Sequence, residues 1–326
     1  MSKSTVKVSA PGKLMLFGEH AVVYGKPCIV TAVDQRIWVS VQKLAKQEIS
    51  IEAPGVGISN YKKNIKKLGI GRDIPKGVKF IEFAVKNFKN KYKLLSGLKI
   101  TTKSGFSSKF GFGSSSAVTV AVLKAISELS RIKLSNNELF DLVYKSVLEV
   151  QGVGSGFDLA AAIWGGTLYF VTGGKKIVPL RTGKLPLVVG YTGVKADTAT
   201  LVRKVASLYE ANGKMVGKIF EAMEEIVESA KKALSKRNYG QLGELMNLNQ
   251  GLLDSLGVST RLLSGLIFAA RETGAYGAKI SGAGGGDCMI AFVDPKRRNK
   301  VESAIKVAGG TILNVKTEAE GVRIEK

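Results

Sequence analysis

Residues 109–117 (KFGFGSSSA) combine glycines, serines and a lysine in a pattern that can hold a phosphate group. Gly111 and Gly113 let the backbone adopt positive φ and approach a ligand closely. The apolar residues after Ser116 recur at three- and four-residue steps, which predicts a buried helix. The unpaired N–H groups and partial positive charge of a helix N-terminus bind anions, most often phosphate. An ordinary serine cap after a flexible turn would give the same pattern, so this loop alone leaves both interpretations open.

A second polar cluster lies near the N-terminus, in residues 9–25 (SAPGKLMLFGEHAVVYG). Lys13 precedes an apolar run, and Glu19 and His20 lie between that run and the next one. Burying a carboxylate and an imidazole side by side is costly unless they are paired or used. The segment therefore predicts either a satisfied buried ion pair or part of a functional site.

Two more glycine loops occur later in the chain. Residues 151–158 (QGVGSGFD) end in a lone carboxylate, Asp158, which either caps a helix or points into a site. Residues 281–287 (SGAGGGD) form the third loop and precede an apolar run that predicts a strand.

This set of residues favours phosphoryl transfer over the other reactions that sequence patterns can indicate. That reaction needs positioned phosphates, cations on the developing charge and a carboxylate near the attacking hydroxyl. The chain has no G-x-x-x-x-G-K-[ST] loop, no G-x-G-x-x-G at a strand-to-helix turn and no protein-kinase H-R-D or D-F-G motif. A Ser–His–Asp hydrolase is disfavoured because His20 is the single histidine and no G-x-S-x-G elbow is present.

The composition is that of a compact globular protein. The chain has 326 residues, of which 45% are hydrophobic, enough for two packed domains or one large one. No apolar run is long enough to span a bilayer and the N-terminus lacks the layout of a signal peptide, so we expect a soluble, cytoplasmic protein without a membrane partner. The two cysteines, Cys28 and Cys288, lie in apolar settings without metal-ligand spacing.

The net charge of +23 allows two interpretations, nucleic-acid binding and attraction of anionic substrates. The lysines are spread along the chain and no zinc-finger or aromatic RNP motif is present, so a solvated basic surface without a nucleic-acid partner is favoured.

The order of the predicted elements changes near residue 185. Strands dominate before it and long amphipathic helices after it, which predicts domains at 1–184 and 185–326. The excursion at 42–75 is predicted to be surface loop. Strands are expected at 5–10, 29–41, 98–102, 168–171, 177–180, 187–191 and 288–293, and helices at 78–95, 117–129, 136–149, 198–210, 215–235, 238–256 and 259–273.

Three motifs together resemble those of one family. Residues 11–25, 111–117 and 279–286 are similar in order and spacing to the three motifs of the GHMP small-molecule kinases, over essentially the whole chain. The resemblance implies an α+β, two-domain GHMP kinase fold with the active site in the cleft between the domains. The N-terminal domain would be an α/β domain of the ribosomal-protein-S5-domain-2 type, and the C-terminal domain a helix-rich, ferredoxin-like α+β domain.

Within the family, residues 18–25 (GEHAVVYG) and residues 246–250 with 256–258 look like the mevalonate kinases, whereas residues 151–158 look more like the phosphomevalonate kinases. The expected function is ATP-dependent phosphorylation of mevalonate to 5-phosphomevalonate, a step towards isoprenoids. The alternatives are a phosphomevalonate kinase of the same fold and, more remotely, a basic non-catalytic nucleic-acid-binding protein.

The resemblance also implies roles for individual residues, with ATP, Mg²⁺ and mevalonate as ligands and a possible homodimer. Asp158 would act on the substrate hydroxyl, and Lys13 would stabilise the charge on that hydroxyl and on the transferred phosphoryl group. Mevalonate would be bound by Glu19, His20, Thr198 and Ser281. The ATP phosphates would be held by Lys109, Gly111, Gly113, Ser114, Ser115, Ser116, Gly282 and Gly284.

The metal site departs from the family pattern. Ser115 would hold Mg²⁺, but the family's metal-binding glutamate falls eleven residues before Asp158, where this chain has Val147. Glu149, two residues further on, is offered as its replacement.

Overall fold

The computed structural model describes residues 5–71, 73–94 and 96–326. Its larger sheet is built on two long strands, β1 (Thr5–Phe17) and β2 (Pro27–Leu44), which pair antiparallel. Both have continuous buried stretches, at 8–17 in β1 and 27–33 in β2, which shows that both faces of the strands are covered there. The strand order is β12-β1-β2-β5-β3-β4, and β6 and β7 extend the sheet from β2. The remaining strands are β3 (Glu48–Ala53), β4 (Ile58–Asn64), β5 (Gly97–Ser104), β6 (Thr167–Val171), β7 (Lys176–Leu180) and β12 (Arg323–Glu325).

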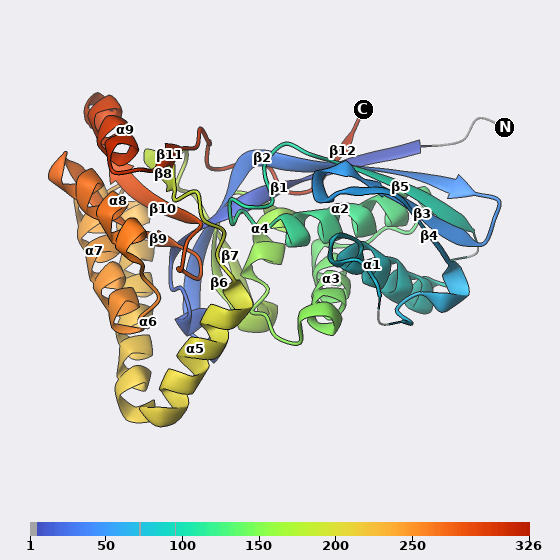
Figure 1. The fold of residues 1–326 in the computed structure, drawn as a ribbon, viewed down its shortest axis with the longest axis horizontal. Coiled ribbons are helices and arrows are strands. Elements are labelled where there is room, and N and C mark those ends of the chain that lie inside the picture. The colour runs from blue at the N-terminus through green and yellow to red at the C-terminus, as the bar shows by residue number, and fades with distance from the viewer. Residues whose placement is uncertain (1–4, 72, 95) are drawn as a thin grey trace.

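Four helices cover this sheet from below in Figure 1, and α2 packs directly on β1 and β2. They are α1 (Lys76–Tyr92), α2 (Ser114–Leu129), α3 (Asn136–Gln151) and α4 (Phe157–Trp164). Helix α3 begins at a capping box in which Ser135 and Glu138 each accept from the other's backbone N–H. The expected helices and strands of this region are confirmed within a few residues at their ends, except that β1 extends seven residues beyond the expected strand at 5–10 and that α4 was not expected.

The expectation that residues 42–75 are surface loop is wrong. They contain β3 and β4, and β3 pairs with β5 in parallel, so it lies inside the sheet. Ile49, Ile51 and Ala53 alternate along β3 and are at most 2% exposed. This period of two is the signal of a half-buried strand. Two of the lysines that suggested a loop, Lys62 and Lys63, belong to β4, at the end of the strand order, where charged residues discourage pairing with another chain.

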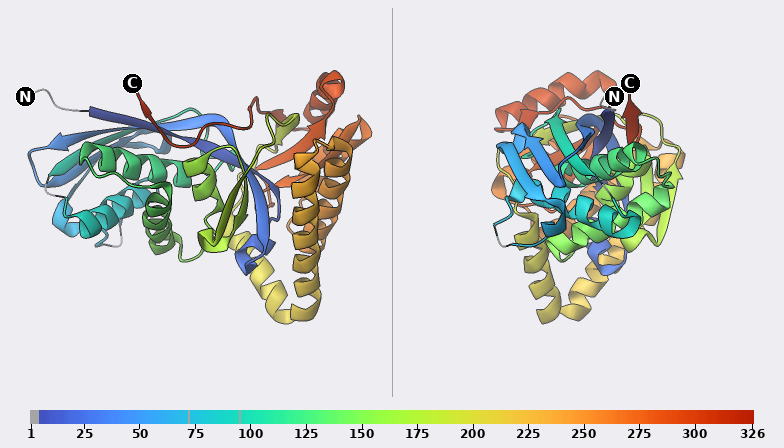
Figure 2. Two further views of the ribbon diagram at one scale, coloured as in Figure 1. Left: turned by 180° about the vertical axis from the view of Figure 1, so that it is seen from behind. Right: turned by 90° about the vertical axis from the view of Figure 1, so that its right-hand side faces the viewer.

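The second half of the chain forms a four-stranded antiparallel sheet, in the order β11-β8-β10-β9, with long helices. Helices α5 and α6 form a hairpin that projects beyond both sheets (Figures 1 and 2). The strands are β8 (Leu187–Tyr191), β9 (Ala275–Ser281), β10 (Cys288–Val293) and β11 (Thr311–Ile312). The helices are α5 (Thr198–Ala211), α6 (Gly213–Ser235), α7 (Tyr239–Ser255), α8 (Arg261–Glu272) and α9 (Arg298–Val307).

The division of the chain at residue 185 remains a prediction. The two sheets lie on either side of that point, but the end of the chain returns to the first sheet, where β12 pairs with β1. Arg36 holds this return, because its guanidinium donates to the carbonyls of Glu320 and Gly321 at 2.7 and 2.8 Å and to Ser9 on β1.

Cys28 and Cys288 are buried and free, as expected for thiols that pack as small hydrophobes. Within the described residues, no helix is both long enough and apolar enough to cross a membrane.

Candidate active site

Lys13 links strand β1 to the glycine- and serine-rich loop that precedes α2. Its backbone N–H donates to the carbonyl of Phe112 and its ammonium Nζ donates to the carbonyl of Gly111, each at 3.0 Å. The residue is buried, and Nζ lies 5.2 Å from the centre of the Phe157 ring at the start of α4. The main-chain bond and the packed side chain together fix a cation beside the loop.

The loop leaves the N-terminus of α2 open. Gly111 and Gly113 have φ of 71° and 74°, in the left-handed region that favours glycine. Gly113 is the N-cap residue and no side chain caps the helix, so the interpretation of an ordinary serine cap is wrong. Ser114 and Ser115 lie half-buried in the first turn. The first N–H groups of α2 are therefore free of side-chain acceptors and can bind an anion.

Asp158 faces this helix end from the first turn of α4. Gly156 is the N-cap of α4, so Asp158 is not the capping residue, which was one of the two interpretations left open. Its Oδ2 accepts from the hydroxyl of the buried Ser116 at 2.5 Å and its Oδ1 accepts from the N–H of Leu159 at 3.1 Å. These two bonds fix the orientation of the carboxylate.

Gly113 shows how closely the parts meet. A Cβ at this position would lie 3.4 Å from the Cε of Lys13 and 3.6 Å from the Cβ of Asp158. The structure thus brings the predicted cation, the predicted carboxylate and the predicted phosphate loop to one place.

Glu19 is a member of a buried ion pair. Its carboxylate accepts from the ammonium of Lys279 on β9, and the two side chains are 1% and 0% exposed. The other carboxylate oxygen accepts from Asn249 on α7 at 3.5 Å. Burial lowers the pKa of Lys279, while the charge of Glu19 opposes that effect. The ion-pair interpretation is confirmed for Glu19, and its contact with mevalonate remains a prediction.

His20 and Ser281 hold the third glycine loop against the first motif. The Nε2 of His20 donates to the carbonyl of Ala283 at 2.9 Å, and burial lowers the pKa of the imidazole, which favours its neutral form. The hydroxyl of Ser281 donates to the carbonyl of Met15 and accepts from its N–H, both at 3.0 Å. Both residues therefore have structural partners, and their roles in substrate binding remain predictions.

The two glycines predicted to hold phosphate differ in their surroundings. A Cβ at Gly282 would meet nothing within 4 Å, whereas one at Gly284 would lie 2.3 Å from the carbonyl oxygen of Val258. Gly282 therefore borders open space, while Gly284 packs against the loop that precedes α8.

Comparison with known proteins identifies the family. Models of the N-terminal and C-terminal domains of GHMP kinases match residues 79–166 and 230–309. The mevalonate kinase of Pyrococcus horikoshii is 40% identical and that of Thermococcus onnurineus 41% identical, each over 98% of this chain and 98% of its own. This chain belongs to the GHMP kinase family.

The crystal structure of the Methanococcus jannaschii mevalonate kinase has the same fold, with a TM-score of 0.81 and 26% identity over 98% of this chain and 99% of that one. The resemblance of the three motifs and the expected two-domain α+β GHMP kinase fold are thus confirmed. Members of this family use ATP, which agrees with the open helix end beside Lys13.

Three predicted site residues of this GHMP kinase make no contact with Lys13 or Asp158 among the interactions described for the structure. Thr198 is exposed at the start of α5, and Lys109 is exposed in the loop. Glu149 forms an ion pair with Lys86 of α1 at 2.6 Å, so its charge is already neutralised.

No group of three His, Cys, Asp or Glu side chains that could hold a metal occurs in the part of the chain that the structure describes. The metal roles of Ser115 and Glu149 remain predictions.

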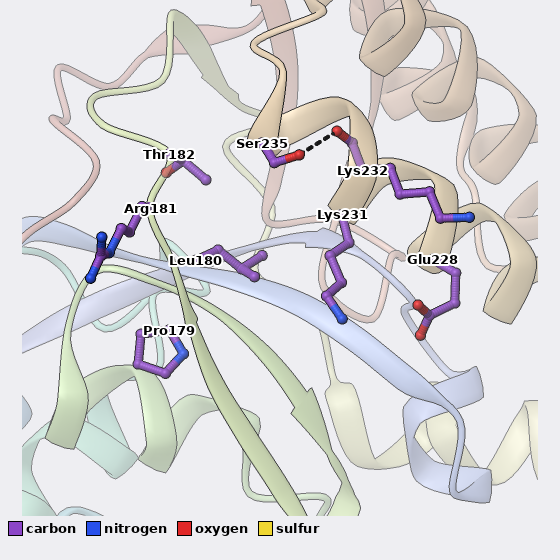
Figure 3. A pocket seen from close by; sticks show the side chains of 8 residues that line it. All are labelled: Pro179, Leu180, Arg181, Thr182, Glu228, Lys231, Lys232 and Ser235. Carbon is purple, nitrogen blue, oxygen red and sulfur yellow. Dashed lines mark hydrogen bonds between the residues drawn. The ribbon is translucent and has the colours of Figure 1, made fainter.

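A pocket of about 390 Å³ between β7 and α6 contains none of the residues of the three glycine loops (Figure 3). Two of its charged side chains contact Tyr169, a residue outside its lining. Glu228 accepts from the hydroxyl of Tyr169 at 2.7 Å, and the ammonium of Lys231 lies 4.6 Å from the centre of the same ring. We therefore place the site at the loops and not in this pocket.

Sequence reasoning did not single out two residues that matter here. Lys279 lies in the third motif, but its pairing with Glu19 joins positions 260 residues apart and leaves no local pattern. Asp287 ends the third glycine loop, and its side chain lies against Gly111. A carboxylate that ends a glycine run was the available signal.

Proposed function

We propose that this GHMP kinase transfers the γ-phosphoryl group of ATP to the hydroxyl of mevalonate and forms 5-phosphomevalonate. The observation that carries the transfer is the uncapped N-terminus of α2 with Lys13 on one side and Asp158, held by Ser116, on the other. The choice of mevalonate rests on curated mevalonate kinases that are about 40% identical over 98% of the chain.

Each residue has a defined task in the proposed reaction. The N–H groups at the start of α2 bind the ATP phosphates, and Lys13 stabilises the negative charge that spreads over the transferred group. Asp158 accepts the proton of the substrate hydroxyl or stabilises the attacking oxygen, in an orientation set by Ser116. A positioned carboxylate and a fixed cation need no large movement during the reaction, which is how preorganised charges lower a barrier.

We also propose that ATP is used as its magnesium complex, which neutralises charge on the β- and γ-phosphates. The hydroxyl of Ser115, in the first turn of α2, and the neighbouring carboxylates are hard oxygen ligands of the kind that Mg²⁺ prefers. Glu149 would first have to break its ion pair with Lys86.

The experiment is ADP release by the purified chain with Mg–ATP, with mevalonate and 5-phosphomevalonate in separate reactions. Turnover with mevalonate alone supports the proposal. Turnover with phosphomevalonate alone would refute it and would mean that residues 151–158 report the substrate. No turnover with either alcohol would also refute it, and salt-dependent nucleic-acid binding would then be measured.

A homodimer and a cytoplasmic location are the remaining proposals from the resemblance. The chain has a mass of 34.8 kDa, so light scattering should give about twice that mass for a homodimer. Fractionation of the source cells would test the location.

A further inference from the structure

Asp287 is a carboxylate fixed at the end of the third glycine loop, just before β10. Its backbone has φ of 55°, and its N–H donates to the carbonyl of Val194 at 2.8 Å. Its carbonyl accepts from the N–H of Thr192 at 3.0 Å, and its Oδ1 accepts from the N–H of Ala196 at 2.9 Å. The position of the side chain is therefore determined by its main chain and by one of its own oxygens.

The other oxygen of Asp287 faces the phosphate loop. A Cβ at Gly111 would lie only 2.5 Å from Oδ2 of Asp287, so a side chain at Gly111 would fill the place of this carboxylate. The carbonyl of the same Gly111 accepts from Lys13. The carboxylate and the catalytic lysine thus lie close to one residue of the loop.

The negative charge of Asp287 is only partly compensated by its surroundings. Burial raises its pKa, and the hydrogen bond from the N–H of Ala196 and the charges of Lys13 and Lys195 oppose this effect. Within the described ranges, Oδ2 has no hydrogen-bond donor, whereas both oxygens of Asp158 and of Glu19 have one. Asp287 thus presents an unpartnered anionic oxygen to the loop.

An unneutralised carboxylate beside a loop that binds a triphosphate would repel its ligand. A divalent cation between the carboxylate and the triphosphate turns this repulsion into attraction, because the cation attracts both groups. A carboxylate oxygen is also the ligand type that Mg²⁺ binds together with nucleotide phosphates.

We propose that Asp287 holds the divalent cation of the Mg–ATP complex, directly or through one bound water. The proposal rests on the proposed use of ATP by this kinase but not on the identity of the phosphate acceptor. It assigns to the end of the third glycine loop the metal-binding carboxylate that Val147, buried in the core, cannot supply.

The test compares the binding of a non-hydrolysable ATP analogue in the presence of Mg²⁺ and in the presence of EDTA, by calorimetry. Asp287→Asn removes the charge but keeps an oxygen that can accept from Ala196, and asparagine tolerates positive φ. The variant should bind the magnesium complex roughly 10- to 100-fold more weakly. The same variant should bind the metal-free analogue at least as tightly as the wild type, because the repulsion is gone.

A second variant and a matched control keep the result interpretable. Asp287→Gly removes the whole side chain at a φ that glycine adopts freely, and should show the same opposite changes if the asparagine variant fails to fold. Asp294→Asn makes the same substitution just past the other end of β10, where Asp294 caps a short turn, and should change neither affinity.

The ratio of the two affinities decides between the proposal and a structural role. If Asp287→Asn weakens both forms equally or changes neither, Asp287 positions the loop or Lys13 and the proposal is wrong. Mn²⁺ electron paramagnetic resonance of the analogue complex gives an independent readout, since loss of a ligand changes the spectrum. No acceptor is present in these assays, so they stand even if mevalonate proves not to be the substrate.

Discussion

The buried pair Glu19–Lys279 gives the sharpest prediction about stability. Removal of one partner of a buried ion pair leaves an uncompensated charge and costs about 3–5 kcal/mol. The side chains here are 1% and 0% exposed, so no solvent screening reduces this estimate. Lys279→Met and Glu19→Leu should therefore each lower the free energy of unfolding by about 3–5 kcal/mol.

The double variant should be more stable than either single variant. Apolar replacements of similar volume remove both charges at once, which is often neutral or stabilising relative to a buried pair. The assay is urea unfolding of the three variants and the wild type at pH 7, in which each single substitution should lower the midpoint by roughly 1–2 M. The resulting double-mutant cycle isolates the coupling energy of the pair.

The stability of Glu19→Leu should also depend on pH, and the direction of that dependence provides a further check. In that variant Lys279 remains buried without its counter-charge, so burial holds its folded-state pKa below the unfolded value. The unfolded chain then binds more protons, and stability must rise with pH between those two values. Costs below 1 kcal/mol in both single variants, or a double variant as unstable as the sum of the two, would refute the reasoning.

Three more predictions concern catalysis, protonation and the C-terminal tail. Asp158→Ala should reduce kcat by roughly 10²–10⁴-fold, and Ser116→Ala should reduce kcat far less, with little change in KM; near-normal turnover of Asp158→Ala would remove this residue from the mechanism. His20 has a lowered pKa, so its contribution to stability is present above about pH 6.5 and is lost as the pH falls towards the folded-state value. NMR titration of this single imidazole should give a pKa below 6.5, and a value above it would contradict the assignment. Arg36→Lys should lower the unfolding midpoint and increase hydrogen exchange in β12, because lysine cannot reproduce the four bonds to Ser9 and the returning chain; unchanged exchange would show that this tie is dispensable.

The sequence predicts the local elements of this protein well where one periodicity dominates. Helices α2, α3 and α6 have apolar faces at three- and four-residue steps, and their observed bounds lie within a few residues of those expected. Strand β3 was missed because glycines and lysines surround its short alternation of Ile49, Ile51 and Ala53. Its place inside the sheet depends on parallel pairing with β5, which no local pattern encodes.

The same contrast applies to the site. Lys13, Asp158 and the loop could be named from the sequence because glycines and isolated charges mark them. Their partners could not be named, because Ser116–Asp158 joins positions 42 apart and Glu19–Lys279 joins positions 260 apart. Glu149 was chosen for its charge and place in the chain, but its ion pair with Lys86 depends on how α3 packs on α1.

The arrangement of paired charges supports the proposed phosphate site at Lys13. Glu82 is as fully buried as Glu19, and it too is held by a lysine, Lys63, at 2.6 Å. Lys13 differs, since within the described residues its ammonium donates to a carbonyl and forms no salt bridge. A buried cation without a salt bridge, beside an uncapped helix end, contributes a positive potential at this point of the loop. In the proposed reaction, the attraction for the ATP phosphates therefore comes from these two features, and not from the net charge of +23, most of which is carried by lysines dispersed along the chain.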